Sequence, residues 1–222
     1  MSSLETAYTF DAVPIEPVAR GTTLIVTGPS LEGLREMLMS ALVAQPTEGA
    51  LVVTADVDAP TAAEAYSSAG GDDSPGRLRM VDCSPESDTT ATEYVRPIAD
   101  PADLTGIGME LSDLYEGFYA DGCEHVRTGF YTLAPLLLYA EDVRSVFRFV
   151  HTVAGRVRSA DGLCVCALDP DTQDERTVSS VTHVFDGKIE LRRGEDGAQI
   201  RVRGLPNQPE GWLSYDPLSR SD

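Results

Sequence analysis

The stretch 22-TTLIVTGPSLEGLR-35 decides the fold, because it joins two kinds of apolar pattern through a short break. Residues 22–27 are apolar and β-branched, which is typical of a buried strand. A glycine, a proline and a serine at 28–30 end this run. From 31 to 44, apolar residues recur at helical spacing. The stretch therefore predicts a strand, a loop and a helix, in that order.

The same alternation continues along the chain. We expect further strands at 49–55, 77–83, 126–133 and 163–168, and helices at 62–67, 104–119 and 139–159. Strands separated by helices of this length imply a mostly parallel sheet with right-handed crossovers. Two alternating segments at 184–193 and 199–205 predict an antiparallel β-hairpin that extends the sheet at its C-terminal end. The sequence thus predicts an α/β fold.

The chain length and composition favour one domain. The 222 residues, 42% of them hydrophobic, suffice for a single substantial core. We expect an N-terminal lead-in at 1–20, one domain at 21–215 and a polar tail at 216–222. The N-terminus lacks a basic region followed by an apolar stretch, and the longest apolar run, at 133–139, is too short to span a bilayer. We therefore expect a cytoplasmic protein without a membrane partner.

The charge balance is strongly acidic. The chain has 36 acidic and 17 basic residues, a net charge of −19, and Lys188 is its one lysine. Nucleic acids and anionic membranes are bound mainly through rows of Lys and Arg, so we expect neither as a partner. The composition resembles that of proteins from cells that keep molar salt in the cytoplasm. A basic protein partner is the alternative explanation for the acidity.

This charge predicts that folding requires high salt. Self-repulsion of a net charge of −19 opposes the compact state unless counterions screen it. We expect the melting temperature to rise between about 0.1 M and 2 M KCl, as followed by circular dichroism. An unchanged melting temperature over that range would contradict the screening argument.

The loop at 28–35 has part of a phosphate-binding pattern. That pattern reads Gly-x-x-x-x-Gly-Lys-Ser/Thr between a strand and a helix, where backbone amides hold phosphates, the lysine neutralises them and the hydroxyl holds magnesium. This chain reads Gly28-Pro29-Ser30-Leu31-Glu32-Gly33-Leu34-Arg35. Both glycines have the right spacing, but Leu34 replaces the lysine and Arg35 replaces the hydroxyl residue. Glu32 also adds a negative charge inside the loop.

Further segments resemble the RecA/KaiC-like ATPases over roughly residues 20–215. In that family a segment similar to Asp-Ser-Leu-Ser-Pro-Leu-Leu follows a central strand, and its aspartate organises magnesium. The corresponding stretch here is Tyr131-Thr132-Leu133-Ala134-Pro135-Leu136-Leu137. Segments 103–110, 174–177 and 185–191 also resemble archaeal KaiC-like proteins. The resemblance implies a RecA-like P-loop three-layer sandwich in a degenerate member of haloarchaeal type, with Tyr131 and Thr132 at the metal-binding position.

Other candidate residues have simpler explanations. Asp56 and Asp58 follow the second strand, near where such ATPases place the glutamate that activates water, but solvated loop acids are the alternative. Gly106 and Gly108 lack the third glycine of a dinucleotide fingerprint, which favours the start of a helix. The cysteines and histidines show no metal-ligand spacing and are interpreted as structural, so we expect no metal site: Cys83, Cys123, Cys164, Cys166, His125, His151 and His183.

These substitutions predict a non-catalytic protein. Phosphoryl transfer depends on positioned charge, and groups at two separated sites are replaced. We expect no catalytic residue and no cofactor, and a regulatory or scaffolding module that binds a protein partner or associates with itself. The alternative is a sensor that binds ATP or ADP without hydrolysis, through the loop amides and Arg35. An enzyme with a different active site is a third hypothesis, but the sequence shows no recognisable catalytic triad, Cys-His pair or metal-ligand pattern for it.

Overall fold

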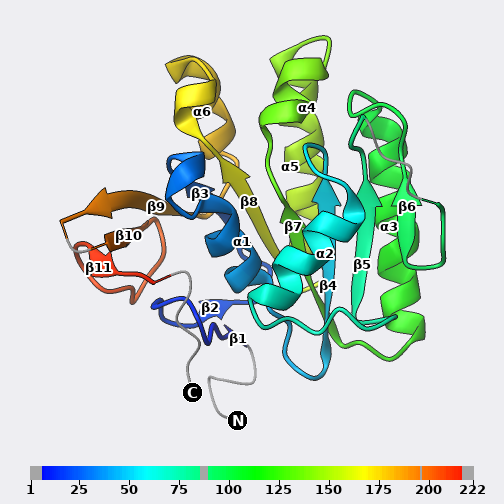
Figure 1. Ribbon diagram of the computed structural model, residues 1–222, viewed down its shortest axis with the longest axis horizontal. Coiled ribbons are helices and arrows are strands. Elements are labelled where there is room, and N and C mark those ends of the chain that lie inside the picture. The colour runs from blue at the N-terminus through cyan, green and yellow to red at the C-terminus, as the bar shows by residue number, and fades with distance from the viewer. Residues whose placement is uncertain (1–6, 86–89, 196, 217–222) are drawn as a thin grey trace.

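A nine-stranded sheet forms the centre of the computed structural model, which describes residues 7–85, 90–195 and 197–216 (Figure 1). The strand order is β11-β10-β9-β3-β8-β7-β4-β5-β6. Strands β3 to β9 run parallel to one another, whereas β10 is antiparallel to β9 and β11 is antiparallel to β10. The strands are β3 (Thr23–Thr27), β4 (Glu48–Thr54), β5 (Leu78–Asp82), β6 (Val95–Pro97), β7 (His125–Phe130), β8 (Leu163–Leu168), β9 (Gly187–Gly194), β10 (Gly197–Arg203) and β11 (Leu213–Ser214).

Helices cover both faces of the sheet and make three layers (Figure 1). Successive residues of a strand point to opposite faces, so Leu24 and Val26 of β3 pack with α1 and α2 in one core cluster. Ile25 packs with α3 and α5 in the other. The α-helices are α1 (Leu34–Leu42), α2 (Ala59–Ser68), α3 (Leu104–Ala120), α4 (Ala134–Tyr139), α5 (Val143–Ser159) and α6 (Glu175–Thr182). The predicted α/β class, the mostly parallel sheet and the C-terminal hairpin are confirmed.

Two predicted elements have the wrong bounds around residues 131–142. The strand predicted at 126–133 ends at Phe130, and the helix predicted at 139–159 begins only at Val143. Between them lies the short helix α4, which begins just before Pro135 and ends where Ala140 becomes extended. Asp142 then starts a new helix, because its carboxylate accepts a hydrogen bond from the backbone N–H of Ser145.

The N-terminal segment contributes to the core. Strands β1 (Ala7–Tyr8) and β2 (Val18–Ala19) form a separate antiparallel pair. Buried side chains of this segment join the cluster that contains α1, namely Tyr8, Val13, Ile15 and Val18. The predicted domain limits, with a lead-in at 1–20, remain a prediction, and residues 217–222 of the predicted tail lie outside the described residues.

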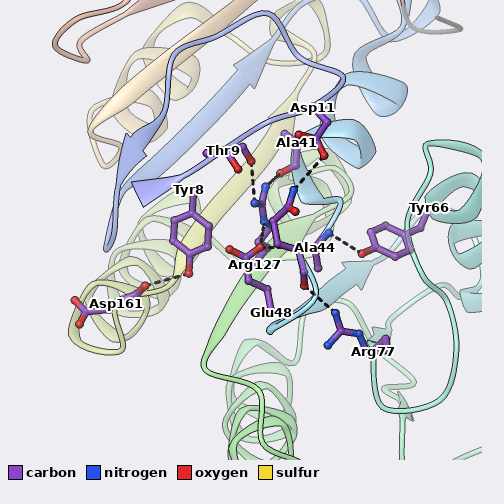
Figure 2. A network of polar contacts seen from close by, with 11 residues as sticks. Tyr8, Thr9, Asp11, Ala41, Ala44, Glu48, Tyr66, Arg77, Arg127 and Asp161 are labelled. Atoms are coloured by element: carbon purple, nitrogen blue, oxygen red, sulfur yellow. Dashed lines mark hydrogen bonds and ion pairs between the residues drawn. The ribbon is translucent and has the colours of Figure 1, made fainter. Parts of the chain in front are cut away.

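A buried ion pair ties this segment to the sheet (Figure 2). Arg127 of β7 is 1% exposed, and its Nε donates to the Glu48 carboxylate of β4 at 2.7 Å. Its other guanidinium nitrogens donate to the carbonyl oxygens of Ala41, at 3.1 Å, and Thr9, at 2.9 Å. The Tyr8 ring lies beside the same guanidinium, 5.1 Å from ring centroid to Cζ. One arginine therefore links β4, β7, α1 and the N-terminal segment.

Candidate functional site

The carboxyl ends of the central strands meet at one edge of the sheet, the upper edge in Figure 1. Ligands of open parallel sheets bind at this edge. Here β3 leads into the loop at 28–33, β4 leads to Asp56, β7 to Tyr131 and β8 to Asp169. The fold thus brings together the two predicted partial sites, which are about a hundred residues apart in the sequence.

The glycine loop is folded into a tight turn. Residues Ser30–Glu32 form one turn of 3-10 helix, η2, and Gly33 then adopts a left-handed conformation with φ 93° before α1 begins. Gly28 is needed for a close approach, because a Cβ there would lie 2.6 Å from the carbonyl oxygen of Leu191. Both glycines therefore have local structural reasons that do not involve phosphate.

A carboxylate of the chain already accepts hydrogen bonds from this loop. The backbone N–H of Ser30 donates to Asp169 at 2.8 Å, and the Ser30 hydroxyl donates to the same oxygen at 2.7 Å. Burial opposes ionisation of Asp169, but the hydrogen bonds from Ser30 outweigh it and lower the pKa of this carboxyl group. Asp169 therefore occupies two donors of the loop, the N–H and the hydroxyl of Ser30, that a bound anion could otherwise use. The sequence signal was an acid directly after the apolar run 163–168, which our sequence reasoning did not use.

The residues at the lysine and hydroxyl positions of the pattern are engaged elsewhere. Leu34 is 2% exposed and packs in the core cluster that includes Tyr131. Arg35 forms an ion pair with Asp56 and lies over the Tyr131 ring, 5.4 Å from its centroid. Burial raises the pKa of Tyr131, against a smaller opposing effect of Arg35. The cation of the loop thus faces a carboxylate and an aromatic ring.

The remaining predicted residues act locally at helix starts. The hydroxyl oxygen of Thr132 accepts a hydrogen bond from the N–H of Ala134 at the start of α4. Asp58 accepts from the N–H of Thr61 and caps α2. Gly106 lies in the first turn of α3, where a Cβ would collide with the capping carboxylate of Asp103. None of these three positions needs a ligand to account for its residue type.

A groove of about 810 Å³ lies next to the loop. Asp56 and Asp58 line it from the β4 side and Leu138 and Tyr139 from α4. Its described lining contains carboxylates, hydroxyls and apolar groups, and no lysine or arginine. Leu138 is 72% exposed and Tyr139 is 51% exposed. The groove therefore offers apolar surface and negative charge, a combination suited to a protein segment and not to a polyphosphate.

The cysteines, possible metal-binding groups and possible membrane helices remain to be described. All four cysteines are buried free thiols. Among residues 7–85, 90–195 and 197–216, no group of three or more His, Cys, Asp or Glu side chains is placed to hold a metal ion. Within the same residues, no helix is both long and apolar enough to cross a membrane.

Comparisons with known proteins agree with this architecture. The model of a protein family of unknown function (DUF7504) matches residues 21–191. No curated protein matches the sequence. Among solved structures, the chain is similar to a KaiC-like protein from the hyperthermophilic archaeon Pyrococcus horikoshii OT3, with a TM-score of 0.67, 12% identity and 95% of each chain covered. At this identity the likeness shows the fold alone, which is that of the RecA/KaiC-like domains.

Proposed function

The chain belongs to the family of unknown function DUF7504, and from this premise we propose that it is a non-catalytic KaiC-like domain that acts as a regulatory or scaffolding protein-interaction module. In this proposal, the edge of the sheet at which related folds bind nucleotide has a structural role only. Its partner is another protein or a second copy of the chain, in a high-salt cytoplasm of haloarchaeal type. Neither nucleic acid nor a membrane is proposed as a partner, because the chain carries a net charge of −19.

The observation that carries the proposal is the contact between Asp169 and Ser30. A bound phosphate would have to displace a carboxylate that accepts two hydrogen bonds, at 2.8 Å and 2.7 Å. Hydrogen bonds to a charged acceptor are about twice as strong as neutral ones. The displaced carboxylate would also repel the incoming anion. An internal anion in the loop therefore opposes nucleotide binding on two grounds.

The charges around the loop support the same conclusion. A nucleotide site needs cations for the phosphates and a carboxylate for magnesium. Here Arg35 is paired with Asp56, and Leu34 lies in the core. The position of the metal carboxylate holds Tyr131, which is 5% exposed. Replacement of the phosphate-binding and metal-binding groups at separated points of one site supports a scaffold that does not hydrolyse nucleotide.

The alternative is a nucleotide sensor that binds without hydrolysis. One feature favours it: Gly33 keeps the left-handed conformation at the start of α1, where a phosphate loop meets its helix. In the sensor, ATP or ADP would open the turn at 30–32 and recruit Arg35. The two hypotheses differ in whether nucleotide binds at all.

Calorimetric titration with ATP, ADP and GTP in the presence of Mg²⁺ tests the proposal. We expect no binding at millimolar nucleotide for the wild-type protein and no hydrolysis above background at any KCl concentration. Asp169→Asn, which removes the charge and keeps the side-chain shape, should also bind no nucleotide. It should cost roughly 1 kcal/mol of unfolding free energy, because Ser30 loses a charged acceptor.

Asp171→Asn is the matched control, because it makes the same charge change on an exposed neighbouring side chain. Low-micromolar nucleotide binding by the wild-type protein would contradict the scaffold hypothesis and favour the sensor hypothesis. Binding by Asp169→Asn alone, with none by the wild type or by Asp171→Asn, would show a latent nucleotide site that Asp169 keeps closed. That result would agree with the argument from Asp169 and would contradict the expectation that Leu34 and Tyr131 prevent binding by themselves.

A further inference from the structure

The β9–β10 hairpin is a cationic segment in an anionic protein. Residues 187–203 contain five of the seventeen basic residues and three acidic ones, a charge of +5 − 3 = +2. The rest of the chain therefore carries −19 − 2 = −21. The hairpin projects from the sheet at the left of Figure 1, beyond the edge that the helices cover.

The pairing of the two strands collects these cations on one face. Ile189 and Leu191 of β9 and Ile200 and Val202 of β10 are buried toward the core. Their neighbours in the strands point the other way. The cross-strand pairs on that outer face are Lys188 with Arg203, Glu190 with Arg201 and Arg192 with Gln199. This cluster of cations is not apparent in the sequence, because buried apolar residues separate the cations along each strand.

Glu190 lies in the middle of the outer face. Its contacts show that the surrounding cations bind a carboxylate. Its carboxylate binds Lys188 at 3.2 Å, Arg201 at 2.6 Å and Arg203 at 3.1 Å. Burial opposes its ionisation, but the hydrogen bonds from these cations lower its pKa. One carboxylate among three cations, with Arg192 beside them, leaves an excess of positive charge for further carboxylates.

Trp212, the one tryptophan of the chain, packs against this face. The guanidinium carbon of Arg192 lies 3.8 Å from a ring centroid of Trp212, and that of Arg201 lies 4.5 Å away. A guanidinium stacked on an aromatic ring is held in place, with its N–H groups directed to the sides. Tryptophan and arginine are the residue types that most often dominate binding at protein interfaces. The face is therefore built like the centre of an interface.

We propose that this cationic face, formed by Lys188, Arg192, Arg201, Arg203 and Trp212, binds an acidic segment of a partner protein. Arginine forks match the two oxygens of a carboxylate, and carboxylates spaced along an extended segment can reach successive cross-strand pairs. Glu190 at the centre and the net charge of −19 disfavour a nucleic acid strand. The inference rests on the proposed function in that it names the partner class of the interaction module.

The probe is a fluorescein-labelled synthetic peptide rich in Asp and Glu with one central leucine. Its anisotropy is measured against the full chain at the lowest KCl concentration at which circular dichroism shows the folded protein. Emission of Trp212 gives a second, local signal. We expect saturable binding that weakens as KCl rises, and a change of Trp212 emission with the same midpoint.

Arg192→Glu should weaken peptide binding at least about tenfold, because it reverses a charge beside Trp212. Arg192 suits this test, since it is exposed and contacts Gln199 and Trp212. Arg176→Glu on α6 is the matched control, an exposed arginine given the same charge change. It should leave the affinity within about twofold, and both variants should melt like the wild type.

Several results would overturn the inference. These are no peptide binding, equal loss in Arg192→Glu and Arg176→Glu, and tighter binding of a single-stranded oligothymidylate than of the peptide. A peptide-independent, concentration-dependent change in Trp212 emission and sedimentation that Arg192→Glu abolishes would assign the face to a second copy of the chain instead. Each of these can occur while the nucleotide titration still gives no binding, so failure here is separate from failure of the proposed function.

Discussion

Replacing Arg127 with methionine should lower the free energy of unfolding by about 3–5 kcal/mol, because it leaves a buried carboxylate without its cation. The Glu48 carboxylate would keep the hydrogen bond from the backbone N–H of Gln45 at 2.9 Å. The carbonyl oxygens of Ala41 and Thr9 would also lose their donors. Urea unfolding followed by circular dichroism, at a KCl concentration where the wild type is folded, measures the change.

A double-mutant cycle separates the ion pair from the rest of the network. Glu48→Leu alone should also destabilise, since it leaves the guanidinium buried beside Tyr8 and Phe10. The double variant with Arg127→Met should be more stable than the sum of the single changes predicts, because no unpaired charge remains. A cost below about 1 kcal/mol for Arg127→Met would show that water reaches Glu48 and that the N-terminal segment does not seal the pair.

The same arginine shows where sequence reasoning ends. Apolar runs at strand and helix spacing sufficed to predict the buried parallel strands and the C-terminal hairpin, because burial alone sets those patterns. Arg127 interrupts one such run, and its partner Glu48 is seventy-nine residues away. A buried charge is compatible with a strand only when distant segments supply its partners. Those partners depend on the tertiary fold and leave no local pattern.

The errors around residues 131–142 have a local cause. An apolar run followed by helical spacing is compatible with one long strand and one long helix or with a shorter strand and two helices. The break was encoded by Pro135 and by the cap at Asp142, two signals of helix starts that lie only seven residues apart. Strand β6 was missed because three residues beside a polar segment have too little pattern to detect.

The candidate site was located by the sequence but not given its shape. Spacing of Gly28 and Gly33 places the loop after the first long strand, which is where β3 ends. The conformation of the loop depends on Asp169, which follows β8 and is distant in the sequence. Parallel strands bring such residues to one edge of the sheet, so the predicted topology indicates which strand ends lie together. It does not indicate which side chains form hydrogen bonds there.

Introducing the lysine of phosphate loops by Leu34→Lys should destabilise the protein by at least about 2 kcal/mol and create no nucleotide site. Leu34 is buried in the cluster with Tyr131, so the new ammonium group would replace an apolar side chain in the core. Burial of a leucine contributes about 1.5–3 kcal/mol by itself, and an unpaired ammonium loses its hydration in addition. Leu34→Met, which conserves volume, should cost less than about 1.5 kcal/mol.

The pH dependence identifies the cause of that loss. A lysine buried without a partner has a lowered pKa in the folded state, so the unfolded chain binds more protons below the ordinary lysine pKa of about 10.4. Stability of Leu34→Lys relative to Leu34→Met should therefore rise with pH toward that value. If the lysine variant instead matches the methionine variant at pH 7 and gains stability from Mg-ATP, its ammonium group has reached the loop. The turn at 30–32 would then open readily enough to admit phosphate, and the sensor would be the better explanation of Gly28 and Gly33, the two glycines at phosphate-loop spacing.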